Sequence, residues 1–360
     1  MNIFKNIFGQ KTITENFSSA IMNSKLHHAY LFSGPAGVGK EAVVMEIIKI
    51  MNCLDNTDKS ACGVCSSCSE FGELRSDDLM YIFPKSIKKS DSEKTVREMN
   101  KMISDNLKLK GLKNGYFKLP FKLGRFITLD QINEIKYFSQ FNSLSKYSKF
   151  VVISNADKMN KEAQNALLKI LEEPPKNMYF FLITENPAVI LDTIISRCQN
   201  ISFPLLNEKD ILNYSKKFFP DIDEETSKEL ASLSLGSIDK FNMLLTEQGN
   251  NLINYQSEIV RLFLTTTPPE TLQLIDTFIE DAKSMSDDDI DFVIYGAVEK
   301  LIIDSFKADK ETSSEYISNI ITHFQRFNYM YRRNINPKLL MINLYFNYRE
   351  EIKKWKTNLK

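Results

Sequence analysis

Short apolar runs alternate with segments of helical spacing along the first two thirds of the chain. The runs are His28 to Ser33 (HAYLFS), Lys149 to Ser154 (KFVVIS), Tyr179 to Thr184 (YFFLIT) and Ile201 to Pro204 (ISFP). Runs rich in Val, Ile and Phe are typical of strands that are buried on both faces. The segments that follow the first two runs, EAVVMEIIKIMN and KEAQNALLKILE, have the spacing of amphipathic helices. The alternation predicts a parallel sheet in an α/β domain.

The pattern changes after Pro204, where long amphipathic segments replace the strand-like runs. We therefore predict three parts: an α/β domain at residues 1–204, a small helical domain at 205–248 and an all-helical domain at 249–360. A Lys- and Ser-rich stretch at about 85–125 fits neither pattern. It is predicted to be a solvated surface insertion, and contact of its lysines with a nucleic-acid backbone is the less favoured interpretation.

A glycine-rich turn follows the first strand-like run and precedes a helical segment. Gly34 to Lys40 (GPAGVGK) matches the G-x-x-x-x-G-K pattern, with Gly34, Gly37, Gly39 and Lys40 as the candidate nucleotide-binding residues. Glycines let backbone N–H groups surround phosphate oxygens, and the lysine reaches the terminal phosphates. The next position normally holds Ser or Thr as a Mg²⁺ ligand, but here it is Glu41. ATP binding is therefore doubtful, and a loop that no longer binds nucleotide is an open alternative.

The second motif of phosphate-loop ATPases is altered as well. In those enzymes an apolar strand ends in an Asp that holds Mg²⁺. In one class of them, a Glu that activates water follows this Asp. The corresponding strand of this chain ends in Ser154 and Asn155. Serine is a weak neutral ligand and asparagine cannot accept a proton. Asp157 lies three residues further on and is predicted to cap the following helix.

Arg197 stands between a segment predicted to be a helix, Pro187 to Ile195, and the last strand-like run. An arginine at such a place can stabilise the charge that develops in phosphoryl transfer, either in its own site or in that of a neighbouring chain. An isolated arginine is more often a surface or ion-pair residue, so its interpretation depends on the motifs around it.

Four of the five cysteines fall within sixteen residues. Cys53, Cys62, Cys65 and Cys68 have the spacing C-x₈-C-x₂-C-x₂-C, which predicts a structural Zn²⁺ site with four thiolate ligands. An iron–sulfur cluster is the competing interpretation, but the ferredoxin pattern places its fourth cysteine three residues further on, before a proline. The remaining one, Cys198, is predicted to be a small buried apolar residue.

The bulk properties exclude some classes of protein. The chain has 46 Lys and Arg and 46 Asp and Glu, so its formal net charge is zero and gives no bulk attraction to nucleic acid. No window approaches the roughly 18 apolar residues of a membrane span, and no signal peptide is visible. We expect a soluble, intracellular protein with no membrane partner.

Taken in order, these motifs resemble the AAA+ clamp-loader subunits of bacterial DNA polymerase III. The segments that carry the resemblance are Phe8-Gly9-Gln10, HAYLFSGPAGVGK, the four clustered cysteines, ITLDQINEI at 127–135, NALLKILEEPP at 165–175, SRC at 196–198 and Asn334-Ile335-Asn336-Pro337. The resemblance covers most of the chain. It implies an α/β AAA+ phosphate-loop domain with a zinc module inserted at about 53–68, a helical lid, and an all-α collar through which subunits assemble.

The departures from that family have a direction. Its gamma/tau ATPase subunits carry Thr after the loop Lys, Asp-Glu at the second motif and Arg after Gly-Ser in the lid, where this chain has Glu41, Ser154-Asn155 and Asp239. The resemblance thus implies a subunit that does not hydrolyse ATP and whose Arg197 acts in trans as an arginine finger at the ATP site of a neighbouring subunit.

The implied partners are gamma/tau and delta subunits and, through the complex, the sliding clamp and primer–template DNA in the cytoplasmic, nucleoid-associated replisome. Two other functions stay open. One is an active ATPase of the gamma/tau kind with unusual ligands. The other is a zinc-dependent nucleic-acid binder, against which the zero net charge argues.

Overall fold

The computed structural model falls into two compact units, Met1–Asn242 and Met243–Lys360, which we describe separately. The described residues are 3–56, 59–84, 105, 116, 126–140, 148–264, 268–283, 285, 287–308, 314–331, 333 and 335–358. Most of the predicted insertion at 85–125 lies outside them. The division into three parts at 204 and 248 stays a prediction.

The first unit is built on a parallel sheet of five strands in the order β2-β3-β4-β1-β5. The strands are β1 (Ala29–Ser33), β2 (Leu79–Ile82), β3 (Lys149–Ile153), β4 (Met178–Thr184) and β5 (Gln199–Ser202), and every pairing is parallel. The predicted parallel α/β sheet is confirmed. The sequence analysis missed β2, a short edge strand of sequence LMYI that is only partly buried and lacks the long apolar run of the central strands.

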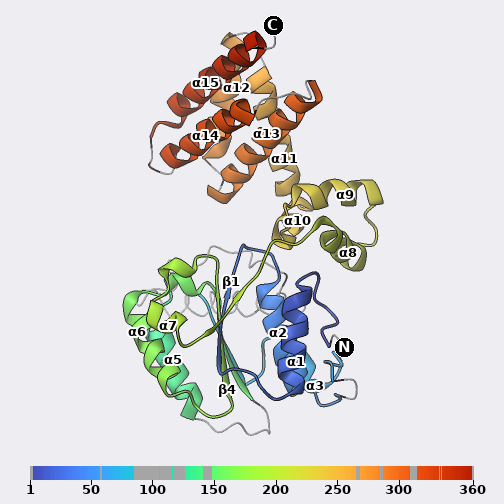
Figure 1. Cartoon of the computed structure of the whole chain (residues 1–360), viewed down its shortest axis with the longest axis vertical. Helices are drawn as coiled ribbons and strands as arrows, with labels where there is room; N and C mark the ends of the chain where they lie inside the picture. Colours follow the sequence, from blue (N-terminus) through green and yellow to red (C-terminus); the bar gives the residue numbers. More distant parts are fainter. Residues whose placement is uncertain are drawn as a thin grey trace. The chain divides into compact units, whose positions relative to one another are not determined.

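Helices cover both faces of this sheet (Figure 1). On one face lie α1 (Lys11–Met22), α2 (Lys40–Asn52) and α3 (Ser66–Gly72); on the other lie α5 (Leu129–Gln140), α6 (Lys161–Glu172) and α7 (Asp192–Ile195). Alternate strand residues face opposite cores, as the pleat requires: Phe32 belongs to the first core and Leu31 to the second. Each such side chain contributes about 1.5–3 kcal/mol by leaving water.

Two local predictions were wrong. The segment Pro187 to Ile195 is not one helix but a 3₁₀ turn, η2 (Pro187–Val189), and the single turn α7, with Ile190 in extended conformation after η2. Asp157 does not cap α6 but lies in the 3₁₀ turn η1 (Ala156–Lys158). The cap of α6 is Asn160, whose Oδ1 accepts the N–H of Ala163 at 2.8 Å. Asn caps as well as Asp, so composition alone could not separate the two residues.

Three helices follow the sheet: α8 (Glu208–Phe218), α9 (Glu224–Leu233) and α10 (Ile238–Leu244). The boundary between the two units falls within α10, after Asn242. The side chains of Asn207 and Asp223 accept backbone N–H groups at the starts of α8 and α9. Such caps satisfy donors that a helix cannot pair internally. The start of α10 places Asp239 against Gly37 of the glycine-rich loop.

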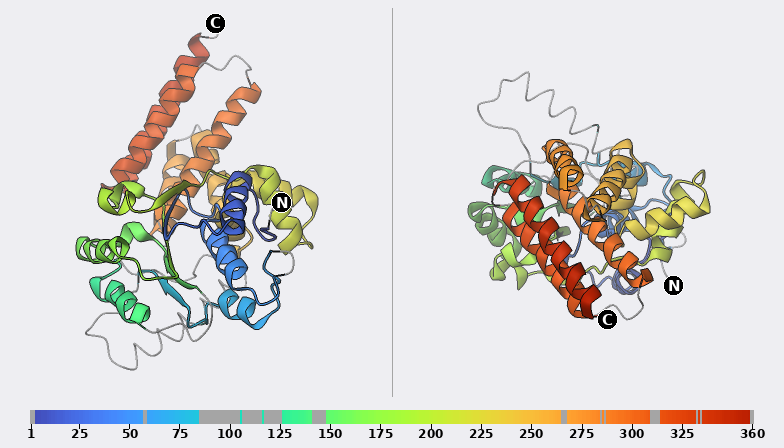
Figure 2. Two further views of the ribbon diagram at one scale, coloured as in Figure 1. Left: turned by 60° about the horizontal axis from the view of Figure 1, so that its bottom comes forward. Right: turned by 90° about the horizontal axis from the view of Figure 1, so that it is seen from above.

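The second unit is helical throughout its described residues. It contains α11 (Glu247–Leu264), α12 (Pro268–Ala282), α13 (Asp287–Ala308), α14 (Ser314–Tyr331) and α15 (Pro337–Asn358). The long helices α14 and α15 lie side by side (Figure 2), and Phe263, Phe324 and Tyr348 form part of the core. The predicted helical C-terminal part is confirmed. Among the described residues, no helix combines the length and apolar character that crossing a membrane requires.

Candidate nucleotide site and metal centre

The predicted phosphate loop joins β1 to α2, so its strand–loop–helix context is present. Gly34, Gly37 and Gly39 have φ of +145°, +72° and +93°, which favours glycine. A Cβ on Gly34 would clash with the carbonyl oxygen of Phe203, and one on Gly37 would clash with Ser237. Backbone conformation and close packing therefore both require glycine at these two positions.

The loop lysine is folded back onto the loop itself. Lys40 is buried, and its Nζ donates to the carbonyl oxygens of Gly34 and Pro35 at 2.6 and 2.5 Å. Burial lowers the pKa of the Lys40 ammonium, and four nearby carboxylates oppose that change: Glu185, Glu41, Asp239 and Asp157. The lysine thus has backbone acceptors where a nucleotide complex would offer it phosphate oxygens.

The two altered positions of the ATPase motifs are bonded to each other. Glu41, in the first turn of α2, accepts a hydrogen bond from the hydroxyl of Ser154, the residue that follows β3. The same carboxylate oxygen accepts from the hydroxyl of Tyr81 on β2 at 3.0 Å. A Mg²⁺ ion held by a loop hydroxyl and a strand carboxylate would need both of these positions as ligands. Here the carboxylate and the hydroxyl are exchanged and satisfy one another.

Asp157, in the turn η1 that follows β3, contacts the end of β4 rather than capping a helix. Its Oδ1 accepts from the hydroxyl of Thr184 at 2.9 Å, and Thr184 in turn accepts the N–H of Asn186 at 3.0 Å. Because the strands are parallel, the ends of β1, β3 and β4 meet at the same edge as the phosphate loop. The sequence predicted a helix cap here, because Asp157 is offset by three residues from the motif and the packing of η1 against β4 is not visible in the sequence.

Two segments that are distant in sequence, the start of α10 and the N-terminal segment, also contact the loop. The N–H of Ile238, at the start of α10, donates to the carbonyl of Gly37 at 2.9 Å, and a Cβ on Gly37 would press against Asp239. From the N-terminal segment, Gln10 Nε2 donates to the carbonyls of Val38 at 3.2 Å and Pro204 at 2.8 Å. The start of α10 and the Gly-Gln element therefore both fasten the loop.

Arg197 lies near the amino-terminal ends of the strands, whereas the loop follows the carboxy-terminal end of β1. The register pairs Tyr30 of β1 with Gln199 of β5, so Arg197 stands level with the start of β1 and Gly34 stands beyond its end. Six residue steps lead along the chain from His28, which is level with Arg197, to Gly34, or about 20 Å at 3.3 Å per residue. Arg197 therefore cannot reach a phosphate on this chain's own loop.

The guanidinium of Arg197 is held at two points and still faces solvent. Nη2 forms an ion pair with Glu172 Oε1 at the end of α6, at 2.8 Å, and Nη1 donates to the carbonyl of Thr193 at 2.9 Å. The side chain is 35% exposed. Both acceptors belong to the same face, so the side chain is oriented without being covered.

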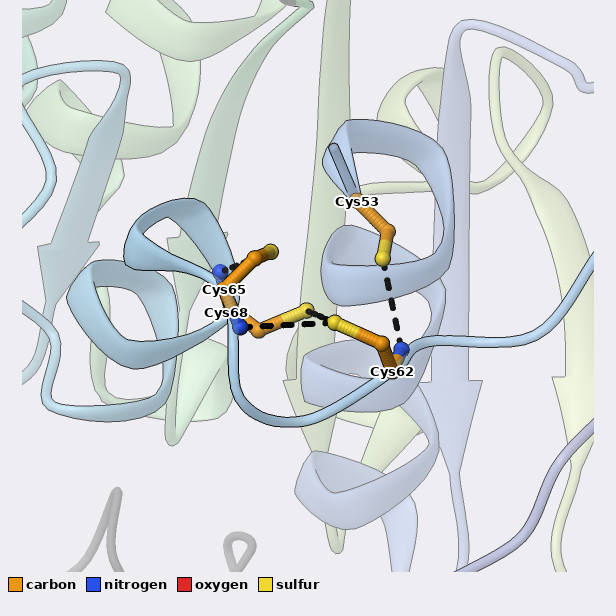
Figure 3. A group of neighbouring side chains, drawn as sticks. All are labelled: Cys53, Cys62, Cys65 and Cys68. Carbon is orange, nitrogen blue, oxygen red and sulfur yellow. Dashed lines mark hydrogen bonds between the residues drawn. The ribbon is translucent and has the colours of Figure 1, made fainter. Parts of the chain in front are cut away.

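The four clustered cysteines converge as their spacing predicts (Figure 3). Cys53 follows α2, Cys62 lies in the loop after it, Cys65 is the N-cap of α3, and Cys68 lies in its first turn. All four Sγ atoms lie within 4.8 Å of one another. Four thiolates at 2.3 Å from a tetrahedral Zn²⁺ stand about 3.8 Å apart, so a small contraction would make the set a closed zinc site.

Backbone N–H groups point at the sulfur atoms of the cluster. The N–H groups of Cys62, Cys65 and Cys68 donate to the sulfurs of Cys53, Cys62 and Cys65 at 3.3, 3.3 and 3.4 Å. Burial alone would raise the pKa of the Cys65 thiol, but donors from Cys68 and Leu54 outweigh it and lower the pKa to about 6. Burial raises the pKa of Cys68 well above its usual range. The four sulfur donors fit a thiophilic metal with tetrahedral coordination. The preference for zinc over iron rests only on the spacing of the cysteines in the sequence.

Cys198 is buried and lies apart from this cluster, as the sequence analysis predicted. Its burial raises the pKa of the thiol to about 12.

The parallel sheet and the glycine-rich loop between β1 and α2 place the chain in the class of phosphate-loop α/β proteins. Within that class, the chain belongs to the family described as DNA polymerase III, delta subunit, whose model matches residues 9–207, more than half of the chain.

Several curated relatives are subunits of the same polymerase. The chain is 30% identical over 246 residues to DNA polymerase III subunit gamma of Buchnera aphidicola subsp. Schizaphis graminum, covering 67% of this chain and 57% of the relative. It is 25% identical to subunit tau of Bacillus subtilis, over 96% of this chain and 49% of that one. It is 30% identical to subunit delta′ of Bacillus subtilis, over 56% and 50%. The chain thus spans about half of the length of these relatives.

Proposed function

We propose that the chain is a non-hydrolysing AAA+ clamp-loader subunit of DNA polymerase III, of the delta-prime type. It helps load the sliding clamp on primed DNA in a cytoplasmic complex with gamma/tau and delta subunits. Its Arg197 supplies an arginine finger to the ATP site of a neighbouring ATPase subunit. Homology to gamma, tau and delta′ subunits supports the family but does not separate the delta-prime type from the active type.

The hydrogen bond between Ser154 and Glu41 carries the non-hydrolysing part of the proposal. Hydrolysis requires a hydroxyl and a carboxylate at fixed sides of Mg²⁺, and a base for water. This chain places the carboxylate on the phosphate side, where it repels the nucleotide, and the neutral hydroxyl on the strand side. Asn155 then stands where the base belongs and cannot take a proton.

The position of Arg197 carries the part that acts on a neighbour. It lies at the sheet edge opposite the chain's own loop, with its guanidinium exposed. A guanidinium presents a planar fork that matches phosphate oxygens. An arginine that is oriented, solvent-facing and remote from its own loop suits a phosphate group supplied by another subunit.

The isolated chain is expected to hydrolyse ATP no faster than its own Lys40→Ala variant. The reason is that removing the loop lysine cannot reduce a turnover that lacks a metal ligand and a base. Steady-state phosphate release from the purified full chain, with a purified gamma/tau-type subunit as the positive control, measures this. Lys40-dependent turnover would instead establish the alternative, an active gamma/tau-like clamp-loader ATPase.

The Glu172→Gln variant is expected to lower the kcat of ATP hydrolysis by the reconstituted complex two- to fivefold, with the KM for ATP unchanged. Glutamine keeps one acceptor but loses the charge that holds Arg197 Nη2, so the finger is ordered less often when the neighbouring site reacts. Glu173→Gln changes the adjacent exposed carboxylate and serves as the matched control. Equal kinetics for both variants would show that the ion pair has no part in orienting the finger.

A further inference from the structure

Tyr116 is packed against the phosphate loop, although it belongs to the Lys- and Ser-rich stretch that the sequence placed on the surface. Its side chain is 2% exposed. A Cβ built on Gly39 would meet Tyr116 Oη at 3.0 Å and Cε1 at 3.1 Å. The ring therefore lies against the backbone where the loop turns into α2, and a side chain at Gly39 would crowd it.

Hydrogen bonds hold this tyrosine at both ends. Its hydroxyl oxygen accepts the N–H of Phe8 at 3.1 Å, in the N-terminal segment. Its own carbonyl accepts from Asn242 Nδ2 at 3.1 Å, and Asn242 Oδ1 accepts from the hydroxyl of Tyr214 at 2.9 Å. Three segments far apart in sequence thus fix one ring in one orientation.

Two aromatic rings, from the N-terminal segment and from α8, pack against Tyr116. Its centroid lies 5.9 Å from that of Phe8 and 5.6 Å from that of Tyr214, and Phe8 makes an edge contact with Phe218 at 5.9 Å. Edge and tilted contacts at these distances are favourable ring geometries. Burial raises the pKa of the Tyr116 hydroxyl, so the ring is neutral.

These surroundings have the features that bind a nucleotide base. A base next to a phosphate loop needs a flat slot, aromatic side chains beside it and a backbone group that pairs with its edge. The slot beside Gly39 has the aromatic residues Phe8 and Tyr214 and the N–H of Phe8, and Tyr116 uses all of them.

We propose that Tyr116 occupies the base position of the phosphate loop and excludes adenine nucleotides from it. The chain's own phenol ring replaces the base, while Lys40 is satisfied by the carbonyls of Gly34 and Pro35 in place of phosphates. The proposed role of Tyr116 deepens the proposed non-hydrolysing function. It rests on that function only because both assume that the loop is of nucleotide-binding origin. The ligand class that the opened slot would take is a purine nucleoside diphosphate.

The test is a fluorescence titration of the full chain with mant-ADP, comparing the wild type with Tyr116→Ala, Tyr116→Leu and Tyr116→Phe. Tyr116→Ala is expected to bind at least tenfold more tightly than the wild type, because it empties the slot. Tyr116→Phe is expected to bind as weakly as the wild type, because phenylalanine still fills it. Adenosine should compete with mant-ADP, and adding Lys40→Ala to Tyr116→Ala should abolish the gain if binding is at the loop.

Each alternative result overturns the proposal. Tight binding by the wild type would show an open slot, and an equal gain in Tyr116→Phe would show that only the hydroxyl mattered. No gain in Tyr116→Ala or in Tyr116→Leu, with both variants folded by circular dichroism, would show that the slot does not accept a base. Binding is measured on the isolated chain, so a failed Arg197 experiment in the complex leaves this result standing.

Discussion

Replacing Arg197 by alanine is expected to slow ATP hydrolysis at the adjoining ATPase subunit by about a thousandfold or more, because an arginine finger contributes about 10³ to 10⁵ to kcat. The loss falls on the single site that this arginine completes. In a complex with several ATP sites, the steady-state rate therefore falls less than the rate at that site. Single-turnover phosphate release resolves the difference, since one kinetic phase should disappear while the others remain.

The fold of this variant should be nearly unchanged, which keeps the experiment interpretable. Arg197 loses an exposed ion pair with Glu172, and such pairs are worth about 0–1 kcal/mol. Arg75 offers a matched control in the same unit, since it is also exposed and pairs with Glu73 at 2.7 Å. Arg75→Ala should leave both ATP hydrolysis and clamp loading intact.

Arg197→Lys separates charge from geometry. Lysine keeps the positive charge but lacks the planar fork that bonds two phosphate oxygens at once. We expect it to recover only part of the lost rate. If Arg197→Ala supports DNA-stimulated ATP hydrolysis and clamp loading at the wild-type rate, no arginine finger acts from this position. The part of the proposed function in which this chain completes a neighbouring ATP site would then be wrong.

The strands and the loop could be predicted because their signals are local. Central strands buried on both faces must be apolar along their whole length, and the loop glycines have φ values that other residues rarely adopt. The edge strand β2 has neither property, since LMYI is short and only partly buried. Its place in the sheet is set by pairing with β3, which the sequence does not display.

The candidate site was predictable only as separate losses. Glu41 and Ser154 each break a motif, but they are 113 residues apart, and their hydrogen bond appears only when α2 and β3 are brought together. The end of the sheet at which Arg197 lies likewise depends on the register between β1 and β5. Tyr116 gave no signal at all, because one aromatic residue in a polar stretch is indistinguishable from a surface residue.

Removing one cysteine of the cluster is expected to abolish metal binding and to unfold the module first. Cys68→Ser replaces a buried ligand with a weaker one. The helix of the module is short: α3 has seven residues, too few for a helix that is stable alone, so it depends on the packing of Phe71 in the core and on the cluster. A metal that binds only the folded form stabilises that form, so its loss should lower the unfolding temperature of the first unit by about 5 °C or more.

Cys198→Ser is the control, since it makes the same chemical change at a buried cysteine outside the cluster. Cys198→Ser and the wild type should each retain one zinc per chain by elemental analysis, while Cys68→Ser should retain none. Iron in place of zinc, with visible absorption, would assign the cluster to the competing interpretation. A wild-type chain that carries no metal after purification under reducing, metal-replete conditions, and whose unfolding does not respond to added Zn²⁺, would contradict the site altogether. The converging sulfurs would then be held by the N–H bonds and by Ser67, whose hydroxyl donates to the carbonyl of Asn52 at 2.6 Å and ties α3 to the end of α2.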